Sequence, residues 1–213
     1  MKFKNMILGA LAFIFMVPTP AAKGAAKGIA FVKVIFLGNA GVGKTTLLNK
    51  IVGKPLSGDH HPTVGVNYVR LTEEDTALDI WDTAGQERYR SIALSFVRNS
   101  KIVVIVFSVD DTNSFGAIVT WLSLLRGYVD IENIKFILVA NKTDLKERLV
   151  AEGEIQQKAE SLGMPVYFCS AKTGEGVDEL KGCMFNLAKE IPQKVTCSLE
   201  TEELHENEDK KCC

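Results

Sequence analysis

One stretch decides the fold of this chain: Gly38-Asn39-Ala40-Gly41-Val42-Gly43-Lys44-Thr45, which has the G-x-x-x-x-G-K-[ST] pattern of a phosphate-binding loop. The apolar run Phe31–Leu37 before it predicts a buried strand, and Thr46–Ile51 after it predicts the opening of a helix. In such a loop, backbone N–H groups and the helix N-terminus bind phosphate oxygens. The lysine contacts the β- and γ-phosphates, and the hydroxyl of Thr45 can bind Mg²⁺. The loop therefore predicts nucleotide binding, but it does not choose among a kinase, an ATPase and a GTPase.

Composition indicates one globular domain. The chain has 213 residues, of which 46% are hydrophobic, and this is enough to bury a substantial core. Its formal net charge of −1 does not favour nucleic acid as a partner. The five cysteines have neither the even count of a disulfide framework nor the spacing of a zinc site, which indicates a reducing compartment.

From residue 30 onward, short apolar runs alternate with helical patterns. The runs that predict strands are 31–37, 64–71, 77–81, 102–108, 136–140 and 166–169. The helical patterns cover 114–128, 154–162 and 177–191. The polar turn 72–76 joins two strands in an antiparallel hairpin, whereas the strand–helix alternation elsewhere predicts parallel pairing. We therefore predict an α/β domain over residues 30–192, with its ligands at the carboxyl ends of the strands.

Residues 1–29 comprise a leader-like apolar segment and a flexible linker, and the part Met1–Val17 is similar to a secretory leader. Lys2 and Lys4 give it a positive start, and the uncharged run Met6–Val17 follows. This run is too short to span a bilayer, which needs about 20 residues. A small-residue stretch, Lys23–Gly28, then has the composition of a flexible linker.

Three motifs at predicted strand ends specify the nucleotide. In Asp82-Thr83-Ala84-Gly85-Gln86, the first residue can hold Mg²⁺ through water, the N–H of Gly85 can sense a γ-phosphate, and Gln86 can orient an attacking water. In Asn141-Lys142-Thr143-Asp144, the carboxylate can accept hydrogen bonds from the N1–H and 2-amino groups of guanine, which adenine lacks. In Ser170-Ala171-Lys172, a backbone N–H can donate to the 6-oxo group of guanine. Their order along the chain predicts a GTP site.

These residues resemble the small GTPase superfamily and, within it, the Rab family of membrane-trafficking regulators. The resemblance is carried by Val64–Tyr68 after Thr63, by Trp81–Arg90 and by the terminal Cys-Cys, and it covers roughly Ala30 to Ile191. It implies a P-loop NTPase G domain: a six-stranded, mainly parallel sheet with one antiparallel strand and helices on both faces. It also implies that Thr63 is the Mg²⁺ ligand of switch I and that the 85–86 pair lies in switch II.

The acidic segment 193–213 predicts a disordered tail that ends in Cys212 and Cys213. The resemblance implies that both cysteines are geranylgeranylated, and stable membrane anchoring does take two lipid signals. It further implies effector proteins, an exchange factor, an activating protein and a dissociation inhibitor as partners. The location that follows is the cytoplasmic face of endomembranes, with cycling through the cytosol.

The predicted function is that of a Rab-like GTPase, a GTP/GDP switch in vesicular membrane trafficking. The predicted catalytic residues are Gln86, which positions water, and Lys44, which together with Mg²⁺ neutralises phosphate charge. The alternative is a nucleotide-gated effector-binding scaffold with negligible hydrolysis. The predicted nucleotide-binding residues are Asn39, Ala40, Gly41, Val42, Gly43, Lys44, Thr45, Thr46, Thr63, Gly85, Asn141, Lys142, Asp144, Ser170, Ala171 and Lys172. The predicted metal ligands are Thr45, Thr63 and Asp82.

Three features depart from this prediction. The leader-like segment points to the secretory pathway, where the sequon Asn141-Lys142-Thr143 would accept a glycan. A start at Met16 would remove most of the apolar run, and a true signal or an anchor remains the alternative. Leu56 stands where the resemblance implies an aromatic ring against guanine, and the interval from Thr63 to Asp82 is a few residues shorter than the family's, which predicts a clipped hairpin.

Overall fold

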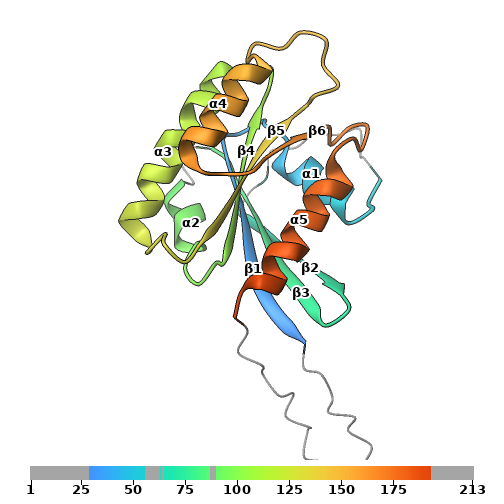
Figure 1. The fold of residues 1–213 in the computed structure, drawn as a ribbon, viewed down its shortest axis with the longest axis vertical. Coiled ribbons are helices and arrows are strands. Elements are labelled where there is room, and N and C mark those ends of the chain that lie inside the picture. The colour runs from blue at the N-terminus through green and yellow to red at the C-terminus, as the bar shows by residue number, and fades with distance from the viewer. Residues whose placement is uncertain (1–28, 56–62, 64, 87–89, 193–213) are drawn as a thin grey trace, which may run out of the picture.

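The computed structural model describes residues 29–55, 63, 65–86 and 90–192 (Figure 1). In chain order the elements are β1 (Ala30–Leu37), α1 (Lys44–Ile51), β2 (Val66–Glu73), β3 (Thr76–Thr83), α2 (Arg90–Ser95), β4 (Ile102–Ser108), α3 (Thr112–Tyr128), β5 (Lys135–Asn141), α4 (Glu152–Leu162), β6 (Val166–Cys169) and α5 (Val177–Glu190). In this part of the chain no helix is both long and apolar enough to cross a membrane.

The six strands form one sheet in the order β2-β3-β1-β4-β5-β6. Strands β2 and β3 pair antiparallel, and every other neighbouring pair is parallel. This confirms the predicted fold. The register places Asp82 opposite Phe36, and it places Asn141 opposite both Ser108 and Cys169. The loops that follow these strands therefore meet at one edge of the sheet, as ligand-binding loops of open α/β sheets do.

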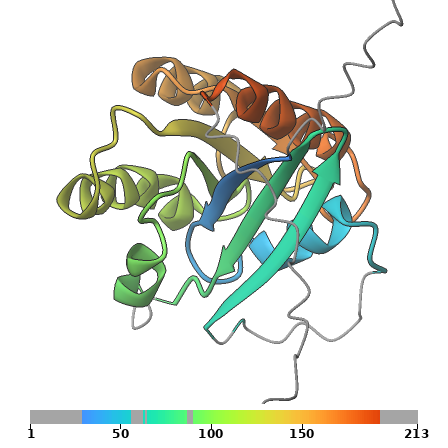
Figure 2. The same cartoon turned by 90° about the horizontal axis from the view of Figure 1, so that it is seen from below.

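Helices cover both faces of the sheet, with α1 and α5 on one side and α2, α3 and α4 on the other (Figures 1 and 2). Each side has its own buried core, because successive strand residues point to opposite faces. In β1, Phe36 belongs to the core under α1 and α5, whereas Ile35 belongs to the core under the other three helices. Strand β4 lies at the centre and all seven of its residues are buried.

The hairpin is antiparallel as predicted, but its turn is shorter than the predicted polar stretch 72–76. The β2–β3 ladder continues to the pair Glu73–Thr76, so only Glu74 and Asp75 form the turn. Glu74 takes the left-handed conformation that such a tight reversal needs, with φ 52°. On an exposed edge strand, residues with polar side chains join the backbone ladder as readily as apolar ones do. Composition therefore misplaced the strand ends of the hairpin.

Helix α2 was not predicted, and helices α3 and α4 each begin two residues before their predicted starts. α2 has only six residues, too few for a helical period to stand out. Among its described side chains, Ala93 and Leu94 are buried. α3 begins at Thr112 because the side chain of Asp111 accepts the N–H of Asn113 as an N-cap. α4 likewise begins two residues before its predicted start.

Candidate functional site

The phosphate loop joins β1 to α1 and closes around the side chain of Lys44. The Lys44 Nζ donates hydrogen bonds to the carbonyl oxygens of Gly38 and Asn39, each at 2.8 Å. The side chain is buried, and burial lowers the pKa of Lys44 to about 8, although the negative charge of Asp82 opposes the shift. The N-cap of α1 is Gly43, which has no side chain with which to cap the helix. The loop thus presents a positive group and a helix N-terminus, the two features that bind anions.

Two glycines allow close approaches to this loop. Gly43 has φ 92°, and a Cβ there would overlap the Asn141 side-chain nitrogen. A Cβ on Gly85 would overlap the backbone of Asn39 and Ala40. The segment after β3 therefore rests directly on the phosphate loop, in a position that only glycine can take.

The three predicted metal ligands come together. The Thr45 hydroxyl donates to Asp82 Oδ2 at 2.6 Å, so the Thr63 hydroxyl, also 2.6 Å away, is the donor to Thr45. Asp82 is fully buried, and its other oxygen, Oδ1, has no hydrogen-bond partner among the described residues. Burial raises the pKa of Asp82, while the hydrogen bond from Thr45 and the charge of Lys44 oppose the rise.

This group of oxygen atoms fits Mg²⁺. Two hydroxyls and one carboxylate are hard ligands of the kind that Mg²⁺ prefers, and the vacant Oδ1 of Asp82 is an acceptor that lacks a donor. No cluster of three or more His, Cys, Asp or Glu suited to a metal occurs in the described part of the chain. The candidate Mg²⁺ site is of a different kind, because two of its three oxygen atoms are the hydroxyls of Thr45 and Thr63.

Asn141 links the phosphate loop to the loop after β6. Its Nδ2 donates to the carbonyl of Val42 at 2.8 Å, and its Oδ1 accepts the N–H of Ala171 at 3.1 Å. The residue is 1% exposed. Because the side-chain nitrogen is buried and already engaged, the sequon at this residue cannot carry a glycan in this fold.

The remaining guanine-motif residues lie beside it. The hydroxyl of Ser170 donates to Asp144 Oδ1 at 2.6 Å, and the Lys172 Nζ lies 3.9 Å from Asp144 Oδ2. Ser170 is fully buried, so the bond fixes the carboxylate from the side of β6. The structure thus brings together the two motifs that follow β5 and β6.

Sequence reasoning missed two partners of predicted residues. Asp110, after β4, holds the Lys142 Nζ with both carboxylate oxygens at 3.3 Å, and it also accepts a short hydrogen bond from Ser108. The indole N–H of Trp121, in α3, donates to Asn39 Oδ1 at 3.1 Å. A charged residue after the buried run of β4 was a weak signal for the first partner. Nothing in the sequence pointed to the second, since Trp121 matches the ordinary buried stripe of a helix.

The other predicted residues are placed as follows. Thr46 is half-buried in the first turn of α1, Ala40 is exposed at the tip of the loop, and Gln86 is half-buried directly after Gly85. Leu56, Cys212 and Cys213 lie outside the described residues.

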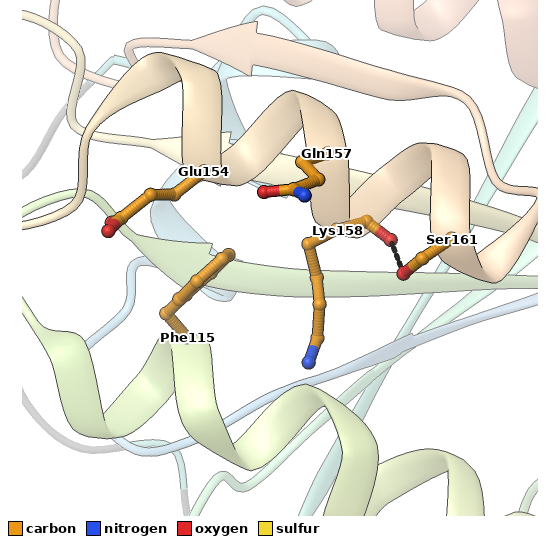
Figure 3. A pocket seen from close by; sticks show the side chains of 5 residues that line it. All are labelled: Phe115, Glu154, Gln157, Lys158 and Ser161. Carbon is orange, nitrogen blue, oxygen red and sulfur yellow. Dashed lines mark hydrogen bonds between the residues drawn. The ribbon is translucent and has the colours of Figure 1, made fainter.

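A cleft of about 370 Å³ lies between α3 and α4, away from these groups (Figure 3). Its lining residues are Phe115, Glu154, Gln157, Lys158 and Ser161. None of them is a predicted site residue, and we assign the cleft no role.

Lys44 is buried inside the loop after β1, and oxygen atoms of Thr45, Thr63 and Asp82 lie close together beside it. The motifs that follow β5 and β6 meet at the same edge of the sheet. This arrangement is that of a P-loop nucleotide-binding domain of the small-GTPase type. The Ras family model matches residues 33–193. Ras-related protein Rab-1D of Dictyostelium discoideum is 34% identical over 176 residues, which cover 80% of this chain and 84% of that protein. GTP-binding protein YPT1 of Saccharomyces cerevisiae is 33% identical over 183 residues, which cover 84% and 87%. Rab-9A of Rattus norvegicus is 38% identical over 153 residues, which cover 68% and 76%. The chain belongs to the Ras family and, within it, to the Rab GTPases.

Proposed function

We propose that the assembled residues bind GTP with Mg²⁺ and hydrolyse it, with Lys44 and Gln86 as the catalytic residues of a GTP/GDP switch. Family membership makes the chain a Rab-like GTPase of vesicle-mediated membrane transport, and it does not favour the scaffold alternative. The observation that carries the assignment of residues is the convergence of Thr45, Thr63 and Asp82 beside the buried ammonium of Lys44.

Lys44 is placed to act by charge. Its ammonium is held by two carbonyls in a site from which water is largely excluded, where electrostatic attraction is stronger than in bulk water. It would pair with the β- and γ-phosphates and stabilise the charge that develops between them. Mg²⁺, held by Thr45, Thr63 and Asp82, supplies further neutralisation of phosphate charge when it is bound.

Gln86 and Gly85 would complete the reaction site. Gly85 rests on the phosphate loop, and its N–H would sense a γ-phosphate bound there. Gln86 follows it immediately and would orient the attacking water. Residues 38–63 contain no arginine. An activating protein would therefore supply the arginine, and such a contribution is worth roughly 10³–10⁵-fold in rate.

Guanine would be read by Asp144 and by the loop after β6. The carboxylate of Asp144 is fixed by Ser170 and can accept from the N1–H and 2-amino groups of the base. The N–H of Ala171 already donates to Asn141, so the 6-oxo group of guanine would compete for that donor or bind the N–H of Lys172.

Two measurements test this assignment. Single-turnover GTP hydrolysis should be lost in Gln86→Leu with GTP affinity retained, whereas Lys44→Ala should lose nucleotide affinity itself. The variant Asp144→Asn should bind xanthosine diphosphate more tightly than GDP. The reason is that the amide can donate to the 2-oxo group of xanthine, which replaces the 2-amino group of guanine. Unchanged hydrolysis in Gln86→Leu would remove its catalytic role, and an Asp144→Asn variant that still prefers GDP would remove the assigned reading of the base.

The membrane cycle is part of the same proposal. Geranylgeranyl groups on Cys212 and Cys213 would attach the switch to the cytoplasmic face of endomembranes, and a dissociation inhibitor would return it to the cytosol. The buried Asn141 sequon supports a cytosolic domain, since that side chain has no room for a glycan. The test is the location of the chain with its native N-terminus, compared with a variant in which both terminal cysteines are serine. A chain cleaved near Ala22 with a glycan on Asn141 would overturn this location.

A further inference from the structure

Asn39 lies where three parts of the molecule meet. Its backbone carbonyl accepts the ammonium of Lys44 at 2.8 Å, and its backbone is the surface on which Gly85 rests. Its side-chain oxygen accepts the indole N–H of Trp121 at 3.1 Å. A shift of Asn39 would therefore move both the carbonyl that accepts a hydrogen bond from Lys44 and the backbone against which Gly85 lies.

Trp121 is a fixed support for Asn39. It lies in the middle of α3, 82 residues further along the chain, and it is 1% exposed. Its ring belongs to the core that packs α3 against the sheet, together with Ile118 and Leu125. The indole N–H can donate but cannot accept, so it can hold only an acceptor, which the amide oxygen of Asn39 provides. The donor is buried and Asn39 is half-buried, so the hydrogen bond is partly shielded from water, which strengthens it.

We propose that Trp121 is a positioning residue for the reaction: its indole N–H holds Asn39 so that Lys44 and Gly85 meet the phosphates in one fixed geometry. Trp121 would act through the phosphate loop, by way of its bond to Asn39, and not by contact with the nucleotide or the metal. This inference rests on the proposed function, because it takes Lys44 and Gly85 as the groups that meet the phosphates.

The first test is a double-mutant cycle. Trp121→Phe keeps an aromatic ring and removes the donor, but it also removes part of the buried ring volume. Asn39→Leu keeps the approximate shape and removes the acceptor. Each should speed GDP release and slow single-turnover hydrolysis by roughly 2- to 10-fold, the equivalent of one neutral hydrogen bond. The release and hydrolysis rates of the double variant should match those of the more impaired single variant, because both substitutions remove the same bond. Asn39→Asp keeps an acceptor, so adding Trp121→Phe to it should still change the rates, whereas adding Trp121→Phe to Asn39→Leu should change them little.

A matched control separates positioning from packing. Leu125→Val removes core volume from the same face of α3 without touching Asn39. It should lower the melting temperature and leave the release and hydrolysis rates unchanged. If Leu125→Val changes these rates as much as Trp121→Phe does, general loosening of α3 explains the effect and the inference is wrong.

The second test observes the bond itself. The chain has two tryptophans, so a Trp81→Phe background leaves one indole N–H signal, that of Trp121, in the nuclear magnetic resonance spectrum of the GDP-loaded protein. Asn39→Leu should shift this signal and speed its exchange with water, whereas Asn39→Asp should preserve its protection. An unchanged signal in Asn39→Leu, or additive effects in the cycle, would overturn the inference. Lys44→Ala keeps the two proposals apart: if it binds GDP as the wild type does, the proposed function fails, and if it loses GDP while Trp121→Phe matches the wild type, only this inference fails.

Discussion

Binding of GDP should be coupled to the uptake of one proton by Lys44. Burial lowers the pKa of this ammonium from 10.5 to about 8 in the nucleotide-free protein. Phosphate charge beside it would raise the pKa again on binding, because an opposite charge favours the charged form. The free protein should therefore lack about half a proton at pH 8 and about nine-tenths at pH 9, and GDP binding should restore it. Above pH 8 the affinity should fall, toward about tenfold per pH unit.

The same shift sets a cost for the empty site. A lowering from 10.5 to about 8 corresponds to about 3 kcal/mol. Between these two pH values the unfolded chain binds more protons than the folded one, so the contribution of Lys44 to the free energy of unfolding rises with pH in that window. Below pH 8 the contribution is constant, since the group is protonated in both states. In the nucleotide-free protein, the contribution of Lys44 to the free energy of unfolding should thus be smallest in the pH range where the nucleotide binds best.

Isothermal titration calorimetry at pH 7, 8 and 9, with Mg²⁺ held constant and in two buffers of different ionisation enthalpy, measures the uptake directly. The phosphates of GDP are fully ionised in the upper part of this range, because the second pKa of a phosphate is about 6. Lys44→Met removes the titrating group, so its residual binding should take up no proton at pH 9. The reasoning fails if wild-type binding takes up none at pH 9, or if Lys44→Met takes up as much as the wild type.

Three further substitutions test the contacts around the loop. Gly85→Ala should leave GDP affinity near the wild-type value but weaken the affinity for a non-hydrolysable GTP analogue, because the new Cβ overlaps the backbone of Asn39. Unchanged affinity for the analogue would show that the close approach is dispensable. Asn141→Ala should lower the free energy of unfolding in a urea titration by roughly 1–3 kcal/mol for each of the two buried partners that it strands, and a loss below 1 kcal/mol in total would contradict the bridge. Asp110→Asn should speed GDP release by no more than about fivefold, because the ion pair between Asp110 and Lys142 is partly exposed. A larger change in a stopped-flow release assay would mean that Asp110 contacts the nucleotide.

The carboxyl ends of β1, β4 and β6 were predictable because these strands are short, mainly apolar runs. Strand β4 is buried along its whole length, and its run had no competing interpretation. Residues such as Asp82 and Asn141 stand directly at or after the ends of such runs, so parallel pairing brings them to one edge without any further information. Elements without this apolar signal were misjudged: the exposed hairpin tip extends past its predicted strand ends, and the six-residue helix α2 was missed.

Partners that come from helices were not predictable. A buried tryptophan in a helix has the pattern of an ordinary core residue, and only the packing angle of α3 decides that its N–H meets Asn39 rather than solvent or another acceptor. The pair Asp110–Lys142 has a similar origin, since two loops that are distant in sequence meet only because β4 and β5 are neighbours. Periodicity specifies which side of an element is buried, and it does not specify the atom that a polar group meets there.

These contacts divide the site into a part that is fixed and a part that can change. The phosphate loop is held from both ends by side chains anchored in the sheet and in α3: Asn141 holds the carbonyl of Val42, and Trp121 holds Asn39. Among the residues that the structure describes, Thr63 meets the loop through a hydroxyl contact with Thr45, and Gly85 meets it by a close backbone approach. A γ-phosphate that enters such a site finds the loop already in place and can reorganise only the weakly held segments. The difference between the GTP and GDP states would therefore arise at Thr63 and Gly85, while the affinity common to both nucleotides would come from the fixed loop.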